Sequence, residues 1–230
     1  MDPLDASLAV VVMKMVRSDL ACSGVMFTLD PDSGHDGVIH ISSAYGLGEL
    51  LVQGTVSPDS FLVWKAGLLK KKHAIVHRNM GQKEHRMIYA SSGRSDTEII
   101  DIGLDERRTW SLENKEVLAL ADMAMRIEQH YGRPMDIEWA KDGLSGELFI
   151  VQARPETVHG KERTNVLTRY VMDTELMTRL QRKGKVLATG HAVGERIGAG
   201  KVRVYADYDD VIRRKRALRD RLADGETMED

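Results

Sequence analysis

The sequence predicts an α+β fold in which a mostly antiparallel β-sheet packs against helices. Three observations support this prediction. Short apolar and β-branched runs recur between residues 7 and 91 with turn-forming residues between them, as expected for strands joined by short connections. Residues 113–131 have the apolar spacing of an amphipathic helix, and two more strand-like runs follow that helix. The chain has 230 residues, of which 42% are hydrophobic, so it can bury a core.

The first half of the chain is predicted to form a meander of strands. Residues 7–16, SLAVVVMKMV, are a continuous apolar run of strand length, which predicts a buried strand. Residues 22–44 hold two strand-like runs around the turn-forming DPDSG, which predicts a hairpin. Residues 46–54, GLGELLVQG, are bounded by glycines and predict a short helix. Further strands are predicted within residues 59–67, 70–78 and 84–91.

The second half begins with the most regular helical pattern in the chain. Apolar residues from Val117 to Ile127 form one stripe at helical spacing, and Gly132 marks the C-terminal end of this helix. A strand, a connector around Gly143 and Gly146, and a second strand are predicted to follow.

The composition also predicts a domain organisation. Residues 1–158 are assigned to one domain, and the polar, basic stretch 159–185 is predicted to be a linker. Strand-like alternation resumes within residues 186–230, which predicts the start of a second domain that ends in a charged, initially helical tail.

The charge balance gives no reason to expect a polyanion or a membrane surface as partner, because the formal net charge is only −2. The basic run Arg213–Arg216 could attract nucleic acid, but the acidic residues 224–230 that follow argue against it. No apolar run approaches the roughly 20 residues that span a bilayer, and the acidic start MDPLDAS does not resemble a signal peptide. The single cysteine, Cys22, fits a reducing compartment and is expected to be buried, so the cytoplasm is the expected location.

Four polar side chains alternate along the two strands predicted after the helix. Because successive side chains of a strand point to opposite faces, Asp136 and Glu138 share one face of the first strand. Gln152 and Arg154 likewise share a face of the second. The apolar residues predicted to lie opposite them, toward the core, are Phe149, Val151 and Ala153.

If these two strands pair, the four polar groups form one patch. Carboxylate and amide oxygens are ligands that Mg²⁺ accepts, and Mg²⁺ is usually held by few protein groups together with substrate phosphates. Arg154 could then bind a phosphate through two hydrogen bonds, so the patch suits a magnesium–nucleotide triphosphate. The alternative is an ordinary half-exposed hairpin in which Glu138 and Arg154 form a surface ion pair. Alternation alone does not decide between the two.

Longer strings indicate a known family. MVRSDLACSGVMFTLD, YGLGELLVQGTVSPDSF, EQHYGRPMDIEWAKDG and QARPETV occur in family order within residues 8 to about 205. They resemble the nucleotide-binding region of the phosphoenolpyruvate synthase (pyruvate, water dikinase) family, a group of dikinases that includes pyruvate, phosphate dikinase and rifampin phosphotransferase. The resemblance implies an ATP-grasp fold, in which ATP lies between two α+β lobes. This chain would supply the C-terminal lobe and the start of a swivelling phosphohistidine-type domain.

The resemblance also implies roles for the four polar residues, with Mg²⁺ as cofactor and ATP as substrate. Glu138 and Gln152 would be the ligands of the metal and the phosphates. Arg154 would act as a catalytic phosphate clamp, and Asp136 as a catalytic carboxylate that supports the same cluster.

Three other segments match the family. The hairpin around Ser23 and Gly24 resembles the glycine-containing loop that closes over the phosphates, although an ordinary hairpin is the alternative. GLGE, residues 46–49, matches as a family marker and is interpreted as a structural turn. The strand whose backbone pairs with adenine is matched by Met13, Lys14, Met15 and Val16.

In the family, the ATP-grasp part transfers a pyrophosphoryl group to a histidine, and pyruvate then becomes phosphoenolpyruvate in a separate barrel, with AMP and phosphate as the other products. The Thr-Cys-His-Ala context of that histidine does not occur in this sequence. The chain is therefore expected to be a fragment that acts with the N-terminal lobe, the phosphohistidine domain and the pyruvate-binding barrel, in cis or in trans, and that is inactive alone.

Alternatives to this expectation remain open. The chain could be a fragment of a related dikinase, or a non-catalytic remnant that acts as a binding or interaction module. Lys70–Lys72 could neutralise phosphates, but this charge run is interpreted as a solvated face.

Overall fold

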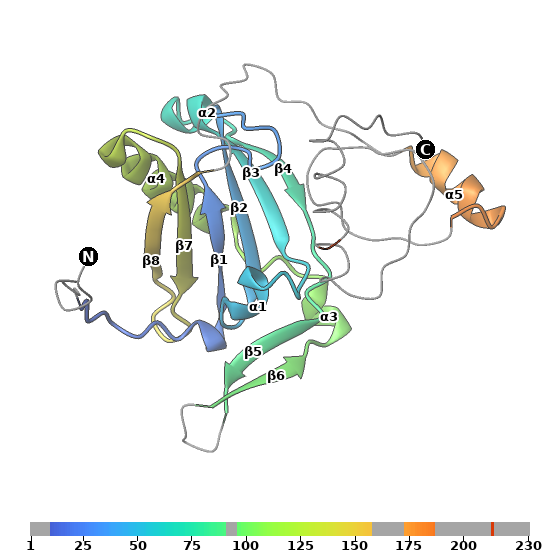
Figure 1. Ribbon diagram of the computed structural model, residues 1–230, viewed down its shortest axis with the longest axis horizontal. Coiled ribbons are helices and arrows are strands. Elements are labelled where there is room, and N and C mark those ends of the chain that lie inside the picture. The colour runs from blue at the N-terminus through green and yellow to red at the C-terminus, as the bar shows by residue number, and fades with distance from the viewer. Residues whose placement is uncertain (1–9, 91–95, 158–172, 187–212, 214–230) are drawn as a thin grey trace. The chain divides into compact units, whose positions relative to one another are not determined.

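The fold is seen in a computed structural model of the chain (Figure 1). The chain divides into two compact units, Met1–Glu195 and Arg196–Asp230, and all described residues except one belong to the first. Within the described part, no helix has the length and apolar character needed to cross a membrane. The structure describes residues 10–90, 96–157, 173–186 and 213.

A six-stranded sheet forms the body of the first unit. Its strand order is β4-β3-β2-β1-β7-β8, and every neighbouring pair is antiparallel. The first four strands are the predicted meander, and β7 and β8 extend the sheet on the other side of β1. The strands are β1 (Cys22–Phe27), β2 (Val38–Tyr45), β3 (Asp59–Trp64), β4 (Ile75–Asn79), β7 (Met135–Lys141) and β8 (Leu148–Pro155).

The predicted hairpin between β1 and β2 is confirmed. The two strands pair from Cys22 opposite Tyr45 to Phe27 opposite His40. The DPDSG segment turns the chain, because the carboxylate of Asp30 accepts hydrogen bonds from both the backbone and the side chain of Ser33.

The predicted long helix is α4 (Asn114–Tyr131), and it covers one face of the sheet (Figure 1). Glu113 and Glu116 form a capping box at its start, and Gly132 ends it in the left-handed conformation with φ of 65°. Its apolar stripe packs on buried strand residues in one core. The fully buried helix residues are Val117, Leu120, Ala121 and Ala124.

This core lies between α4 and one face of the sheet. Met26, Ile41 and Ile137 are completely buried in it, and Cys22 is buried as expected. Burial raises the pKa of the Cys22 thiol to about 12, so the thiol stays protonated at neutral pH. Since apolar side chains occupy the face of the sheet under α4, polar side chains of these strands that could bind a ligand lie on the opposite face. This opposite face of the sheet is the open face.

The strand predicted within residues 84–91 does not join the meander. It is β5 (His85–Tyr89), and it pairs with β6 (Thr97–Asp101) in a separate two-stranded sheet. Met87 of β5 is buried in a second, small apolar cluster with Leu50 of the adjoining helix. The sequence did not predict β6, because its exposed residues give no alternating apolar pattern.

Short helices connect the strands. The helix predicted within residues 46–54 is confirmed as α1 (Glu49–Val52), and Gly46 before it has φ of 85°, in agreement with the structural turn interpreted for GLGE. The other helices are α2 (Lys65–Leu69), α3 (Leu104–Arg107) and α5 (Thr174–Arg182).

The buried strand predicted for residues 7–16 is wrong where the structure describes it. Residues 10–16 pair with no strand, and Val10, Val11 and Val12 are 81%, 77% and 95% exposed. An apolar, β-branched run favours extended backbone, but a strand also needs a neighbour to satisfy its hydrogen bonds. The described residues provide no such neighbour for this segment.

Predictions for the C-terminal part remain largely untested. Residues 158–172 and 187–212, which contain most of the predicted linker and the resumed strand pattern, lie outside the described residues. Helix α5 lies within the predicted linker, and the carboxylate of Asp173 caps its N-terminus by accepting hydrogen bonds from the backbone of Glu175 and Leu176.

Candidate functional site

The four polar residues of β7 and β8 lie on one face of the sheet, as the sequence predicts. Asp136 is directly opposite Arg154, and Glu138 is directly opposite Gln152. Residues directly opposite each other in an antiparallel pair share a face. The residues between them on β7, such as the completely buried Ile137, face the core under α4. The open face therefore carries two carboxylates, an amide and a guanidinium on adjacent strands.

A β-bulge changes the face of the sheet on which the neighbouring β8 side chains lie. Glu138 pairs with Gln152, but the next residue, Trp139, pairs with Ile150, so β8 contains one extra residue at Val151. Ile150 therefore packs against the core, whereas Phe149 lies on the open face.

The prediction that Phe149, Val151 and Ala153 face the core is consequently correct only for Ala153. Strict alternation could not reveal the bulge, because an extra residue shifts every side chain beyond it to the other face.

Arg154 has a defined partner. Its Nε donates a hydrogen bond of 2.8 Å to Oδ2 of Asp136. This hydrogen bond and the Asp136 charge raise the pKa of Arg154, and the charge of Glu138 contributes further in the same direction. The surface pair between Glu138 and Arg154, which was the alternative to a binding site, is not formed.

Glu138 is the carboxylate of the cluster that remains available. It is half-buried, and no hydrogen bond or ion pair joins it to another residue within the described ranges. Arg154 interacts with Glu138 through charge alone, without a hydrogen bond, so the Glu138 oxygens are available to a cation from outside the chain. Gln152, directly across on β8, offers a second oxygen at the same place.

A cavity of about 470 Å³ opens beside Glu138. Its walls come from the N-terminal segment, β1, both ends of α1, β7 and β8. Phe149 is a wall residue that sequence reasoning did not find, because the bulge brings it there. The cavity brings together seven residues that were predicted to contact the nucleotide: Met13, Lys14, Met15, Val16, Ser23, Gly24 and Glu138.

Asp136, Gln152 and Arg154 lie outside the cavity lining. They follow it along the strands on the same face, since the register places Phe149 opposite Ala140, then Gln152 opposite Glu138, then Arg154 opposite Asp136. The open face thus runs from a mostly apolar cavity, past an unpaired carboxylate, to a guanidinium.

The chain is similar to a known domain over most of its length. The sequence pattern of the pyruvate phosphate dikinase, AMP/ATP-binding domain matches residues 1–174. The chain belongs to this family.

Several phosphoenolpyruvate synthases are similar to the chain. The Escherichia coli (strain K12) protein is 50% identical over 214 residues, which cover 92% of this chain and 26% of the relative. The Aquifex aeolicus protein is 44% identical over 215 residues, or 91% of this chain and 25% of the relative. A probable phosphoenolpyruvate synthase of Methanocaldococcus jannaschii is 31% identical over 210 residues, or 91% of this chain and 16% of the relative. The chain spans about a quarter of the length of the first two relatives.

In this dikinase domain, Ser23 and Gly24 do not lie in a loop, which corrects the prediction. They lie within β1, in the middle of the sheet. The Ser23 hydroxyl donates a 2.7 Å hydrogen bond to the carbonyl oxygen of Gly46. A Cβ on Gly24 would lie 1.9 Å from the carbonyl oxygen of Ser42 and 2.7 Å from the Trp139 ring, so packing alone requires glycine there. Both residues border the cavity while serving these structural contacts.

The predicted adenine-contacting segment is fixed by side chains rather than by a strand ladder. Nζ of Lys14 lies 4.8 Å from the centroid of the Phe149 ring, a cation–π geometry. The Tyr89 hydroxyl contacts the sulfur of Met15 at 3.4 Å, and the guanidinium of Arg17 lies over the same tyrosine ring. These contacts hold the segment against β8 and β5 at the cavity.

The residues present fit a magnesium ion that is shared with substrate phosphates. Within the described ranges, no group of three or more His, Cys, Asp or Glu residues could hold a metal by itself. Glu138 and Gln152 offer two oxygen donors on adjacent strands, and Asp136 already accepts a hydrogen bond from Arg154. Mg²⁺ keeps several ligands from water or phosphate, so two protein oxygens are a sufficient protein contribution.

Proposed function

We propose that this chain is the C-terminal ATP-grasp lobe of a phosphoenolpyruvate synthase, where it binds Mg-ATP on the open face of its sheet. The observation on which the proposal depends is the unpaired carboxylate of Glu138, which borders the cavity and lies opposite Gln152. Membership of the AMP/ATP-binding domain family supports a nucleotide as the ligand.

The order of groups along the open face suggests how the nucleotide lies. The base would occupy the cavity beside residues 13–16, where Phe149 offers an aromatic face. The phosphates would extend toward Glu138 and Gln152, and Arg154 would bind a terminal phosphate with donors that its contact to Asp136 leaves free.

A bound magnesium ion would neutralise phosphate charge during transfer. The protein's own contribution is then positioning and charge. Asp136 orients the Arg154 guanidinium, which stabilises negative charge on the transferred group. The open-face carboxylate and amide fix the position of the phosphates relative to that guanidinium.

The rest of the reaction would require other domains of the same enzyme. The related phosphoenolpyruvate synthases are about four times longer than the matched region. A second ATP-grasp lobe, a phosphohistidine domain that accepts the pyrophosphoryl group and a pyruvate-binding barrel would complete the conversion of pyruvate to phosphoenolpyruvate, AMP and phosphate.

The test is calorimetric titration of the chain with ATP, with and without Mg²⁺. We expect magnesium-dependent binding that Glu138→Gln weakens at least tenfold, because a charge-assisted contact contributes about 1.5–3 kcal/mol. Glu147→Gln, an exposed change in the connection between β7 and β8, is the matched control and should bind like wild type. Equal affinity for the wild type and Glu138→Gln would contradict the site. Binding without turnover in the completed enzyme would instead indicate a non-catalytic module.

A further inference from the structure

A second cavity, of about 670 Å³, lies at the opposite edge of the sheet from the proposed ATP site. The connection between α2 and β4, the edge strand β4 and the start of α4 form its walls. Its volume is in the range of small-molecule sites. Four basic side chains line it, and no acidic one does: they are Lys71, Lys72, His73 and Arg78.

Arg78 is fixed in place at this cavity. Its guanidinium lies 5.2 Å from the centroid of the Trp110 ring, and its Nη1 donates a 3.2 Å hydrogen bond to Oδ1 of Asn114. Asn114 is the first residue of α4, whose positive dipole end therefore borders the same cavity. An arginine held by neutral neighbours keeps its charge and free donors for a further partner.

The backbone conformation of Lys71 belongs to the end of α2: its N–H donates to the carbonyl oxygen of Leu68, and the N–H of Lys72 donates to that of Gly67, as in a Schellman cap. The φ of Lys71 is 50°, in the left-handed region that costs free energy for a residue with a Cβ. Among the described residues, only Lys83 is another non-glycine with positive φ, and it is buried in an ion pair with Asp59. This cap fixes the backbone of Lys71 and Lys72 where they line the cavity.

The nearby carboxylates do not neutralise these cations. The carboxylate of Glu113 forms an ion pair with Nζ of Lys115 at 2.9 Å, and the carboxylate of Glu116 forms one with Nζ of Lys141 at 2.6 Å. Since the whole chain has a net charge of −2, the concentration of positive charge around one concave surface is local. A concave surface of one sign focuses the electrostatic field on a ligand of the opposite sign.

From this cavity we infer a second anion site, which binds a small phosphate-bearing metabolite and is separate from the proposed ATP site. Arg78 would form the directional contact to the phosphate, and the two lysines would supply further charge. Lys70, Lys71 and Lys72 are all exposed, as the interpretation of a solvated face expects, and the proposal adds a ligand to that face. It does not depend on ATP binding at Glu138, because the two sites lie on different edges of the sheet.

The test uses inorganic pyrophosphate as probe, without Mg²⁺, and follows backbone amide signals of the full 230-residue chain by NMR. We expect saturable shifts at residues 70–78 and 114, and a Kd that rises at least tenfold in Lys72→Gln/Arg78→Gln. Arg182→Gln/Lys183→Gln, which removes two exposed cations at the end of α5, is the charge-matched control and should change the Kd less than twofold. Sulfate at equal ionic strength separates a phosphate site from general screening.

The variant Lys71→Gly distinguishes an effect on anion binding from an effect on folding. Glycine adopts positive φ without the cost that a Cβ imposes, so this variant should unfold at the same or a higher temperature. It removes one cation, so its Kd for pyrophosphate should rise at least threefold. Unchanged affinity in both Lys71→Gly and Lys72→Gln/Arg78→Gln, or shifts confined to residues 136–154, would overturn the proposal.

Discussion

At the scale of single residues, the two carboxylates of β7 are not equivalent. Asp136 is committed to Arg154 through a 2.8 Å hydrogen bond, whereas Glu138, two residues further along, has no such partner within the described part of the chain. Both occupy the same face of the same strand, so sequence pattern treats them alike. The difference arises across the strand pair, where an arginine lies opposite one and a glutamine opposite the other.

Arg154 should matter more for ligand binding than for folding. Its side chain is 60% exposed, so solvent screens its interaction with Asp136, whose own side chain is 14% exposed. We expect Arg154→Gln to change the melting temperature by less than about 2 °C while weakening Mg-ATP binding about tenfold or more. Differential scanning fluorimetry and calorimetric titration on the same samples measure both quantities. A large loss of stability, with affinity retained, would assign Arg154 a structural role instead.

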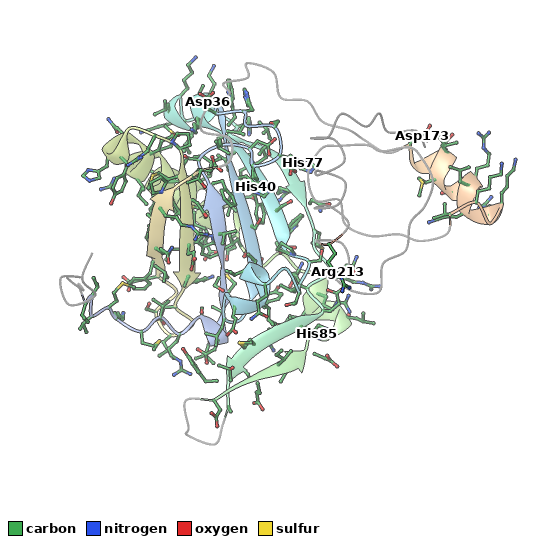
Figure 2. The ribbon with its side chains drawn as sticks, viewed as in Figure 1. Asp36, His40, His77, His85, Asp173 and Arg213 are labelled. Atoms are coloured by element: carbon green, nitrogen blue, oxygen red, sulfur yellow. The ribbon has the colours of Figure 1, made fainter. Side chains whose placement is uncertain are left out.

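His40 lies on the open face of β2, where Figure 2 labels it together with His77 of β4. Its strand neighbours are apolar, Phe27 on one side and Leu62 on the other. Its Nδ1 is buried and has no hydrogen-bond partner among the residues that the structure describes. Desolvation lowers the pKa of His40 below its ordinary value of 6.5, although the charges of Asp30 and Asp32 oppose this shift.

This lowered pKa predicts a loss of stability in acid. Below about pH 6.5 the unfolded chain takes up a proton at His40 that the folded chain resists, so the free energy of unfolding falls as the pH drops toward the folded-state pKa. His40→Phe should flatten this dependence and be at least as stable as wild type at pH 7.5, because it removes a buried unpaired nitrogen. Urea unfolding at pH 7.5 and 5.5 measures the difference, with the exposed His130→Gln as control. Parallel pH profiles for wild type and His40→Phe would contradict it.

At the scale of secondary-structure elements, a buried ion pair joins three segments. Asp59 at the start of β3 and Lys83 are both completely buried and form a salt bridge. The Asp59 carboxylate also accepts hydrogen bonds from the backbone of Gly81 at 2.9 Å and from the backbone and hydroxyl of Ser111 at 2.8 and 2.7 Å. One carboxylate therefore fixes the loop before β5 and the segment before α4 to the sheet.

Removing this carboxylate should be severely destabilising. Asp59→Ala leaves the Lys83 charge and several donors buried without partners, and we expect it to lose about 3–5 kcal/mol of unfolding free energy. Lys83→Met should lose less, since Asp59 keeps its three other hydrogen bonds. Chemical denaturation measures both, and Lys115→Gln on the surface of α4 serves as the neutral comparison. A greater loss in Lys83→Met than in Asp59→Ala would contradict this account.

The elements that the sequence predicted correctly are those stabilised by interactions between residues close together in the sequence. The hairpin around DPDSG and α4 were predictable because turn residues, the helical stripe and Gly132 act within a few residues of one another. The bulge at Val151 and the departure of β5 from the meander were not, because each depends on a partner that is distant in the sequence. In the same way, the shared face of the four polar residues was predictable from alternation, whereas the role of Phe149 in the cavity was not.

At the scale of the whole molecule, the proposed ATP site is a surface with one side open. The cavity has walls from the sheet and from the N-terminal segment, while Val10, Val11 and Val12 beside it are almost fully exposed. Ligand sites usually bury most of their ligand, and contiguous exposed apolar residues often mark a contact surface. Both features fit a nucleotide that a second lobe covers.

We therefore expect Mg-ATP to bind more tightly when a second lobe is supplied. The chain would be mixed with the segment of the Escherichia coli phosphoenolpyruvate synthase that precedes the matched region, and titrated by calorimetry. The affinity should rise at least about tenfold over the chain alone, which corresponds to about 1.4 kcal/mol from the contacts that close over the nucleotide. Glu138→Gln should abolish most of this gain, because the added lobe would still meet a nucleotide without its carboxylate–metal contact. The added segment alone is titrated as the baseline. A mixture that binds Mg-ATP no more tightly than the chain or the added segment does alone would contradict a shared site.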